Sequence, residues 1–312
     1  MLTIFSTPKP FRGHIATIQR NAIESWKRIH PNVEIIIFGD DEGAAEAARE
    51  MGIRHVAHVE RNKHGTKYLT SIFDQAQICA RHPILCYVNC DIVLMSDFRR
   101  ALERVSARYA RFLMVGQRWD TDITELLDFE EPNWESRLYA RAREANHQRP
   151  PQWIDYFVFS HGLYLKNTPP FVIGRPSWDN WLMWKARDTG AAVVDVSNVV
   201  CAVHQNHDYS YHPDGEVGVW KGEEANTNLL LARKGTHMRT IEDATAVLRE
   251  DGLGPNYYRP WSATKRCAWE LGRFLRYKIM HPIWFLFLDV TRPIRSALGL
   301  RSGMQQRFRK RA

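Results

Sequence analysis

Apolar residues along the first ninety positions follow two alternating patterns. Unbroken runs of Ile, Val, Leu and Phe are typical of strands buried on both faces, whereas apolar residues three or four positions apart indicate one face of a helix. Their alternation predicts an α/β fold, a Rossmann-like, mostly parallel sheet flanked by helices. The predicted strands are 2–6, 33–41, 53–59 and 83–89, and the predicted helices are 14–29, 42–52 and 65–81.

The pattern becomes less regular further along the chain. Residues 119–150 are polar and predict an inserted helix and loop that would suit a lid. Strand and helix patterns resume at 153 and end in a strand that runs into a His-rich loop near 204–212. We therefore expect three parts, an α/β domain over 1–215, a helical extension over 216–258 and a basic, aromatic-rich, helical C-terminal tail over 259–312.

The positive charge of the chain is concentrated in the predicted tail. Residues 259–312 contain 13 Lys and Arg against two acidic residues, whereas the remaining residues contain 30 basic and 33 acidic ones. The main body lacks the basic balance typical of nucleic-acid binding, and no nucleic-acid module accompanies the tail, so we expect no nucleic-acid partner. Basic residues interleaved with Trp, Phe and Leu suit an anionic membrane surface or, equally, a helical cap packed on the domain.

The cysteines and the N-terminus bear on where the protein works. Five cysteines are scattered with no Cys-x-x-Cys pair, which favours reduced, buried thiols over a disulfide framework or a zinc site. The first residues lack the basic and apolar regions of a secretory signal, and no apolar run reaches the roughly 18 residues of a membrane span. We expect a cytoplasmic protein, peripheral on the inner membrane face if the tail binds lipid.

Three groups of polar residues follow predicted strands in order along the chain. The carboxyl ends of parallel strands form the crevice in which ligands bind in such folds. Taken singly, each group has a structural explanation, as a turn, a helix start or surface histidines. The groups are Asn89 with Asp91, Asp179 between Trp178 and Trp181, and His204 with His207.

Together and in this order, the three groups resemble the GT-A-type glycosyltransferases, which move a sugar from a nucleotide-diphosphate donor to an acceptor. The resemblance covers roughly residues 1–215. It implies that Asp91 is the metal-binding acid of an Asp-x-Asp motif, with Asn89 at the first position, where an uncharged amide departs from the family pattern. It further implies a Mn²⁺ or Mg²⁺ cofactor that neutralises charge on the leaving diphosphate. His204 or His207 would complete the metal shell, and His204 is preferred because it directly follows a strand.

The same resemblance assigns the remaining roles. Asp179 looks like the catalytic base of the inverting members, and Asp155 is its rival on a neighbouring strand. Trp178 and Trp181 would form an apolar platform for the acceptor. The nucleotide and its phosphates would be framed by Thr7, Pro8, Arg12, Asp40 and Lys67.

Two other functions remain open from the sequence. A catalytically inactive nucleotide- or sugar-binding protein of the same fold is favoured by Asn89. A sugar-phosphate nucleotidyltransferase would need a Gly-rich phosphate loop after the first strand, and the stretch STPKPFRGH has a single Gly. For the transferase, the expected partners are a UDP-, GDP- or dTDP-sugar and a glycan, a lipid-linked acceptor or another hydroxyl.

Overall fold

The computed structural model describes residues 1–208 and 215–257, and seven isolated positions between 264 and 279. The chain divides into two compact units, 1–259 and 260–312, and all the elements described below belong to the first. The predicted tail, with its expected membrane or packing role, lies outside the described residues apart from those isolated positions. Within the described part of the chain, no helix has the length and apolar character needed to cross a membrane.

The first ninety residues alternate between strands and helices as predicted, and each of the predicted elements there overlaps an observed one. The helices are α1 (Gly13–Lys27), α2 (Ala44–Met51), α3 (Leu69–Cys79), α4 (Ser96–Arg108), α5 (Trp134–Ala145), α6 (Trp178–Asp188), α7 (Gly215–Lys221) and α8 (Glu223–Leu231), with 3₁₀ turns η1 (Arg233–Gly235) and η2 (Ile241–Asp243). The strands are β1 (Leu2–Ser6), β2 (Glu34–Phe38), β3 (Arg54–Val56), β4 (Ile84–Val88), β5 (Ile92–Val93), β6 (Phe112–Val115), β7 (Arg118–Thr121), β8 (Tyr156–Ser160), β9 (Ala192–Asp195), β10 (Ala202–Gln205), β11 (Ala246–Arg249) and β12 (Gly252–Pro255).

The central sheet is mixed but mostly parallel. Among the described residues it has nine strands in the order β12-β11-β9-β6-β8-β4-β1-β2-β3. Five of the eight neighbouring pairs are parallel, which confirms the predicted fold class. β8 is antiparallel to both of its neighbours, β4 and β6, at the middle of the sheet.

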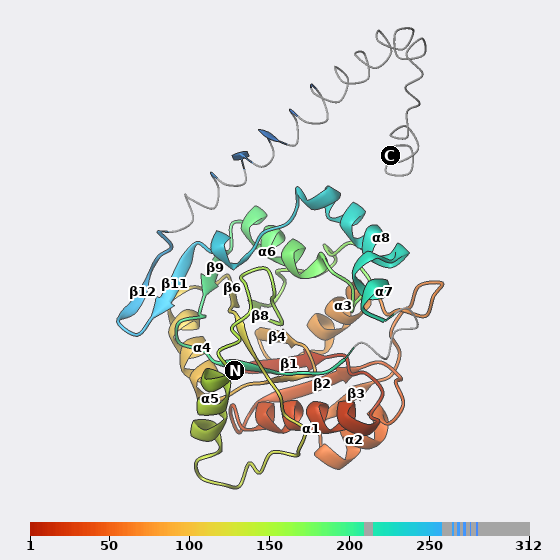
Figure 1. The fold of residues 1–312 in the computed structure, drawn as a ribbon, viewed down its shortest axis with the longest axis vertical. Helices are drawn as coiled ribbons and strands as arrows, with labels where there is room; N and C mark the ends of the chain where they lie inside the picture. The colour runs from red at the N-terminus through yellow and green to blue at the C-terminus, as the bar shows by residue number, and fades with distance from the viewer. Residues whose placement is uncertain are drawn as a thin grey trace, which may run out of the picture. The chain divides into compact units, whose positions relative to one another are not determined.

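Both faces of the sheet are covered, so successive residues of each strand enter opposite cores. In β2, Ile35 and Ile37 pack in a cluster with residues of α1, α2 and α4, while Ile36 and Phe38 pack with residues of α3 and α6. Figure 1 shows α1 and α2 on one side of the strands and α6 on the other. This two-sided burial explains why the strands are unbroken apolar runs.

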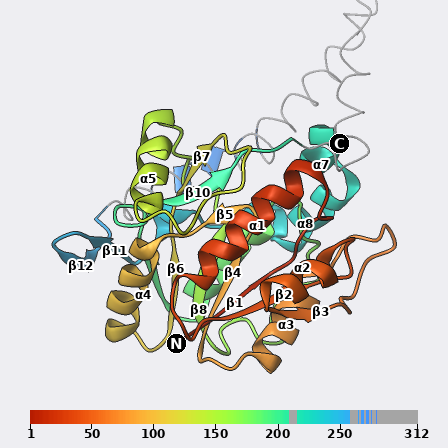
Figure 2. The same ribbon diagram turned by 90° about the horizontal axis from the view of Figure 1, so that it is seen from below.

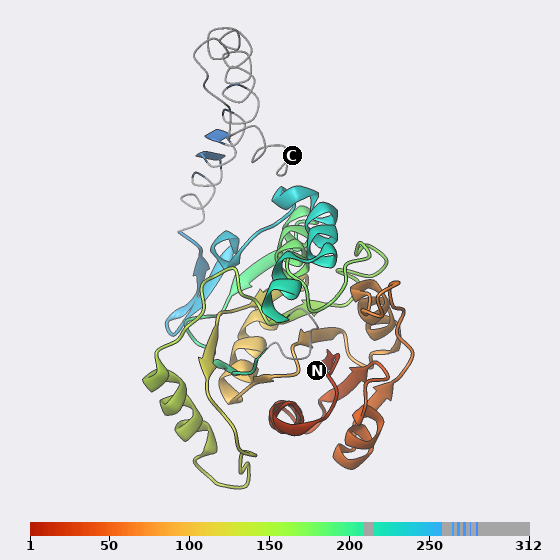
Figure 3. The same ribbon diagram turned by 45° about the vertical axis from the view of Figure 1, so that its right-hand side comes forward.

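A second, smaller sheet lies beside the first and contains β5, β10 and β7 in that order. β10 is antiparallel to β5 and parallel to β7, which brings together segments about a hundred residues apart in the chain. In Figure 2, α5 lies against this sheet, and in Figure 3 the same helix, drawn in olive, lies on the other side of the unit from the orange α2 and α3. The polar segment 119–150 therefore supplies a buried strand, β7, as well as the predicted helix, α5.

The structure differs from the sequence predictions in two places. The segment 216–258 is not helical throughout, because β11 and β12 return to extend the main sheet. β6 was not predicted as a strand, although it lies near the centre of the sheet.

Candidate active site

A cleft of about 1520 Å³ opens at the carboxyl ends of β1, β2 and β4. One end is lined by the loops that follow β1 and β2, and the middle by the loop between β4 and β5. Residues 146–155, the start of α6, and α7 and α8 complete the lining. The polar groups singled out in the sequence are thus found in the crevice that this sheet architecture provides for ligands.

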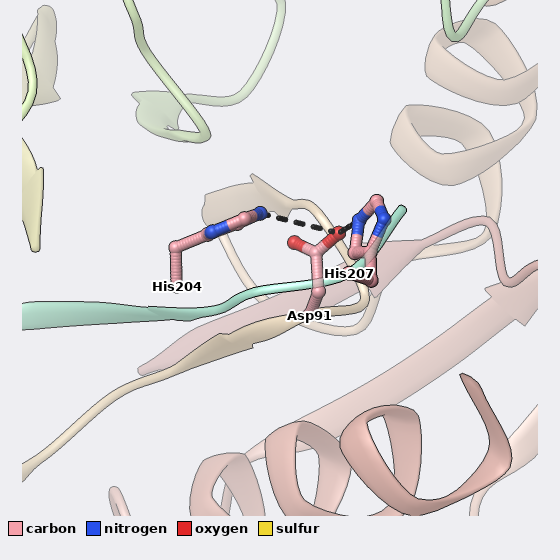
Figure 4. Close-up of side chains that lie close together, drawn as sticks. All are labelled: Asp91, His204 and His207. Atoms are coloured by element: carbon pink, nitrogen blue, oxygen red, sulfur yellow. Dashed lines mark hydrogen bonds and ion pairs between the residues drawn. The ribbon is translucent and has the colours of Figure 1, made fainter. Parts of the chain in front are cut away.

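Asp91, His204 and His207 form a compact cluster in the middle of the cleft. One ligand atom from each residue lies within 4.8 Å of those of the other two. The Nε2 atoms of His204 and His207 are 3.9 Å and 3.1 Å from the same carboxylate oxygen, Oδ2 of Asp91. Figure 4 shows the two imidazoles on either side of that carboxylate. Two imidazoles and one carboxylate converging in this way are a ligand set that suits a divalent metal ion.

The register of the small sheet builds this cluster. His204 of β10 pairs with Ile92 of β5, the residue directly after Asp91, and on the other side with Asp120 of β7. The backbone N–H of Gln205 donates to the Asp91 carbonyl at 3.1 Å and so fixes the loop that carries the carboxylate. The cluster of Asp91, His204 and His207 therefore depends on a strand pairing that local sequence patterns do not reveal.

The Asp91 carboxylate is buried and only partly satisfied. Burial alone would raise its pKa, but the charge of His204, the hydrogen bond with His207 and the charge of Lys9 outweigh it and hold the pKa of Asp91 well below its usual range. Its second oxygen, Oδ1, has no hydrogen-bond partner among the described residues. A buried carboxylate oxygen without a partner beside two imidazoles is the arrangement expected where a cation binds.

Neighbouring groups lie beside both histidines. Nδ1 of His204 lies 3.3 Å from Oδ1 of Asp120, within ion-pair distance but outside hydrogen-bond geometry, and Nδ1 of His207 lies 2.7 Å from the carbonyl oxygen of Asp208. A proton on each Nδ1 would leave the lone pair of each Nε2 available to a cation beside Asp91. Such outer partners raise the basicity of imidazole ligands and fix their orientation.

Lys9 is a site residue that the sequence analysis missed. Its Nζ lies 3.0 Å from Nε2 of His207 and 3.9 Å from Oδ2 of Asp91. Burial lowers the pKa of Lys9, against the opposing effect of the Asp91 charge. Its backbone is held by two hydrogen bonds with the side chain of Gln19 on α1. Lys9 is thus a positioned cation beside the Asp91–His204–His207 cluster, and a lysine in the loop STPKPFRGH gave little sign of it.

A chain of buried charges runs from the Asp91–His204–His207 cluster to Asp155, the rival candidate for the catalytic base. Arg118 donates from Nε to Asp120 at 2.9 Å and from Nη1 to Asp155 at 2.6 Å. The other oxygen of Asp155 accepts the amide of Asn89 at 2.6 Å. The Asn89 carbonyl oxygen in turn accepts the hydroxyl of Tyr87 at 3.1 Å. Both Asn89 and Asp155 are therefore occupied by protein partners, an arrangement that suits positioning more than proton transfer.

Asp179 differs from Asp155 because one of its carboxylate oxygens has no hydrogen-bond partner among the described residues. It lies in the first turn of α6, which starts after Ser177 in the left-handed region at φ 89°. Burial, together with the nearby charge of Asp155, raises the pKa of Asp179 to about 7, and its Oδ1 has no hydrogen-bond partner among the described residues. A carboxylate in the cleft with a raised pKa and an unused oxygen has the properties of a general base.

The end of the cleft near β1 and β2 is organised by Lys67. Its buried ammonium donates to Oγ1 of Thr7 at 2.7 Å, to the Pro8 carbonyl at 3.1 Å and to the carboxylate of Asp41. Gly39 allows this approach, because at φ 113° a Cβ on Gly39 would lie 2.7 Å from Nζ of Lys67. Thr7, Pro8 and Lys67 accordingly line the cleft where the sequence led us to expect the nucleotide.

The structure corrects three predicted contacts. Arg12 and Asp40 do not line the cleft, since each is on an exposed loop and forms an ion pair with a neighbouring side chain, Arg12 with Glu42 and Asp40 with Arg61. Trp181 is also absent from the lining, because its ring is buried in the core.

The neighbours of these corrected residues remain in the cleft. The acid that lines this end is Asp41, one residue after Asp40. Trp178 does line the cleft, but its ring is largely buried and packs edge-on against Tyr87 with 5.5 Å between ring centroids. The predicted Trp178–Trp181 platform is therefore not formed.

Comparison with known proteins adds the following. No family model and no curated protein matches the sequence. Similar solved structures include glucosyl-3-phosphoglycerate synthase from Mycobacterium tuberculosis in complex with Mg²⁺ and UDP, at 15% identity and TM-score 0.44 over 75% of this chain and 79% of that one. Another is TarS 1–349 from S. aureus, at 9% identity and TM-score 0.45 over 65% of this chain and 60% of that one.

The same synthase in complex with Mn²⁺, UDP and glucosyl-3-phosphoglycerate is 16% identical, with a TM-score of 0.44 over 75% of this chain and 80% of that one. Both neighbours are GT-A glycosyltransferases, the family that the sequence resembles. At these identities and TM-scores, similarity does not define the family or the activity of this chain. Its function has to be inferred from the geometry of the site.

Proposed function

We propose that this protein is a metal-dependent glycosyltransferase that moves a sugar from a nucleotide-diphosphate donor to an acceptor hydroxyl, with inversion at the anomeric carbon. One observation supports this proposal above the others. The cleft that contains the convergent ligands Asp91, His204 and His207 also contains Asp179, a half-buried residue whose shielded carboxyl group has a pKa raised to about 7.

The proposed cofactor is Mn²⁺ or Mg²⁺, held by Asp91 with His204 and His207. The two imidazoles suit Mn²⁺ better than Mg²⁺, which prefers oxygen ligands. The chemistry that such an ion supplies is neutralisation of the negative charge that develops on the leaving diphosphate. Lys9 would add a second positive charge beside the same group, since its ammonium lies next to His207 and Asp91. The nucleoside would occupy the end of the cleft near Thr7 and Lys67.

In the transfer itself, Asp179 accepts the proton of the acceptor hydroxyl as that oxygen attacks the anomeric carbon of the donor sugar. The new carbon–oxygen bond forms as the bond from the anomeric carbon to the diphosphate breaks, and the diphosphate leaves with the electron pair. The proton stays on Asp179 until water removes it. Asp155, bound by Arg118 and Asn89, positions the loop that carries Asp91.

The test is donor hydrolysis by the purified full chain. UDP-, GDP- and dTDP-sugars are incubated with Mn²⁺ or with a chelator, and nucleotide release is measured for wild type and for Asp91→Asn. The expected result is release of one nucleotide that needs both the metal and Asp91. A matched control is Asp251→Asn, at an exposed aspartate in the turn between β11 and β12, which should release nucleotide like wild type.

Other outcomes would count against the proposal. Nucleotide release that persists in chelator, or equally in Asp91→Asn, would contradict a metal-dependent reaction at this cluster. A nucleotide that binds with metal, yet is not turned over with any acceptor tried, would favour the binding-only alternative. Absence of any nucleotide binding would remove the basis for the assigned roles.

A further inference from the structure

We infer that the acceptor is a neutral saccharide whose ring packs on Trp153 and Trp220, an inference that rests on the proposed transferase function. These two residues replace the Trp178–Trp181 platform expected from the sequence. Both line the cleft, and both side chains are only half-buried. Half-exposed aromatic rings inside a cleft are typical of surfaces that hold a ligand with an apolar face.

The two rings form one surface from two separate segments. Their centroids are 5.0 Å apart with an interplanar angle of 53°, so the pair is tilted and makes a shallow aromatic corner. Trp153 belongs to the segment that enters β8, and Trp220 belongs to α7. A pyranose ring has flat patches of C–H groups that such a corner can cover, while its hydroxyls stay at the rim.

The aromatic corner lies next to the groups assigned to the chemistry. The guanidinium of Arg118, which bonds Asp155, lies 5.3 Å from the centroid of Trp153. The carbonyl of Gln152, the residue before Trp153, accepts the side-chain amide of Asn180 at 3.3 Å. Asn180 directly follows Asp179 on α6, so a ring on this surface would present a hydroxyl near the proposed base.

Charge at this end of the cleft favours a neutral ligand. Arg149 also lies over Trp153, at 5.0 Å, but both arginines are already paired with buried carboxylates. Arg118 pairs with Asp120 and Asp155, and Arg149 pairs with Asp120 at 2.5 Å, so two positive charges meet two negative ones. The other polar residues of segment 146–152 that line the cleft are Asn146, His147, Gln148 and Gln152, whose side chains can hydrogen-bond hydroxyl groups without requiring charge.

The experiment measures binding and needs no turnover. Saturation-transfer NMR is recorded for methyl glycosides of glucose, galactose and mannose and for glucose 6-phosphate, with the full chain, in the presence and absence of Mn²⁺ with UDP, GDP or dTDP. We expect at least one methyl glycoside to bind and to bind no more weakly than the phosphorylated sugar. Trp220→Leu should weaken that glycoside about tenfold. Trp184→Leu is the control, because Trp184 lies outside the cleft lining and stacks on His237.

Each outcome bears on the inference separately from the proposed function. Unchanged affinity in Trp220→Leu, much tighter binding of glucose 6-phosphate than of every glycoside, or no saturation transfer from any glycoside would overturn the saccharide site. Trp153→Leu provides a second variant if Trp220→Leu fails to fold. Glycoside binding lost in Trp220→Leu, with no nucleotide release from any donor, would retain the saccharide site and reject the transferase.

Discussion

Asp120 contacts no ligand in the proposed mechanism, yet its removal should be felt at the metal. Asp120→Asn keeps the shape of the side chain and removes the charge that faces Nδ1 of His204 at 3.3 Å. The pKa of Asp120 is low because the interaction with His204 and the charge of Arg118 outweigh the effect of burial. The carboxylate is therefore ionised across the working pH range, and the substitution removes a full charge.

The size of the effect follows from two contributions. Loss of an outer carboxylate that orients a histidine ligand lowers metal affinity about 10- to 100-fold. This corresponds to about 1.4–2.8 kcal/mol. Removing one partner of a buried ion pair lowers the free energy of unfolding by about 3–5 kcal/mol. For Asp120→Asn we expect a loss of about 3 kcal/mol, because Arg118 keeps its second partner, Asp155, at 2.6 Å.

Mn²⁺ affinity is measured by titrating the protein and following the paramagnetic resonance of free Mn²⁺, after urea unfolding has confirmed that the variant is folded at the working temperature. Asp251→Asn, at an exposed aspartate in the turn between β11 and β12, should bind Mn²⁺ like wild type. Equal affinity of Asp120→Asn and wild type would refute the orientation argument. If Asp91→Asn also bound Mn²⁺ like wild type, the cluster would not be the metal site at all.

Three further predictions concern stability and pH. Lys67→Met leaves the Asp41 carboxylate without its buried partner and should lower the free energy of unfolding by about 3 kcal/mol, whereas the exposed Lys63→Met should change it by less than about 1 kcal/mol in urea titrations. Because the pKa of Asp179 is raised to about 7, the folded protein keeps a proton that the unfolded chain releases above about pH 4, so the free energy of unfolding should fall between about pH 4 and 7. Asp179→Asn should flatten this dependence of the free energy of unfolding on pH, measured by urea titrations at pH 5 and 8, and an unchanged slope would count against the raised pKa. In wild type the transfer rate should rise with pH up to about 7. Gly39→Ala should displace the Lys67 ammonium and lower the free energy of unfolding by about 2–4 kcal/mol. A free energy within about 0.5 kcal/mol of wild type in urea unfolding would contradict this prediction.

The sequence predicted the fold class because strands buried on both faces have a composition of their own. Runs such as ILCYV in β4 and EIIIF in β2 contain no polar alternation, and this pattern indicates a covered sheet. Composition does not reveal strand direction, however. YFVFS in β8 resembles the parallel strands beside it, although it runs antiparallel to both neighbours. β6, only four residues long, offered too short a pattern to be recognised.

The candidate site was predictable only where its residues directly follow strands. Asp91 and His204 follow or end apolar runs, and the structure brings them together with His207. Asp120 was missed because its role arises from cross-strand register in the small sheet, which depends on residues far apart in the chain. Lys9 was missed because one lysine in a loop looks like surface charge until α1 is placed beside it.

The distribution of buried charge supports a functional rather than a purely structural origin for this cleft. Buried ion pairs seldom add stability relative to well-packed apolar residues, because desolvation offsets their attraction. Here Asp91, Asp120, Asp155 and Arg118 are all buried, and Arg118 pairs with both Asp120 and Asp155, whereas most of the main sheet is packed with apolar side chains. A fold able to fill the same space with Val and Ile, as it does along β2 and β9, has little structural reason to concentrate carboxylates at one edge. The unpartnered Oδ1 of Asp91 gives the reason that is missing, since a cation bound there would stabilise the folded state by an amount that grows with its concentration.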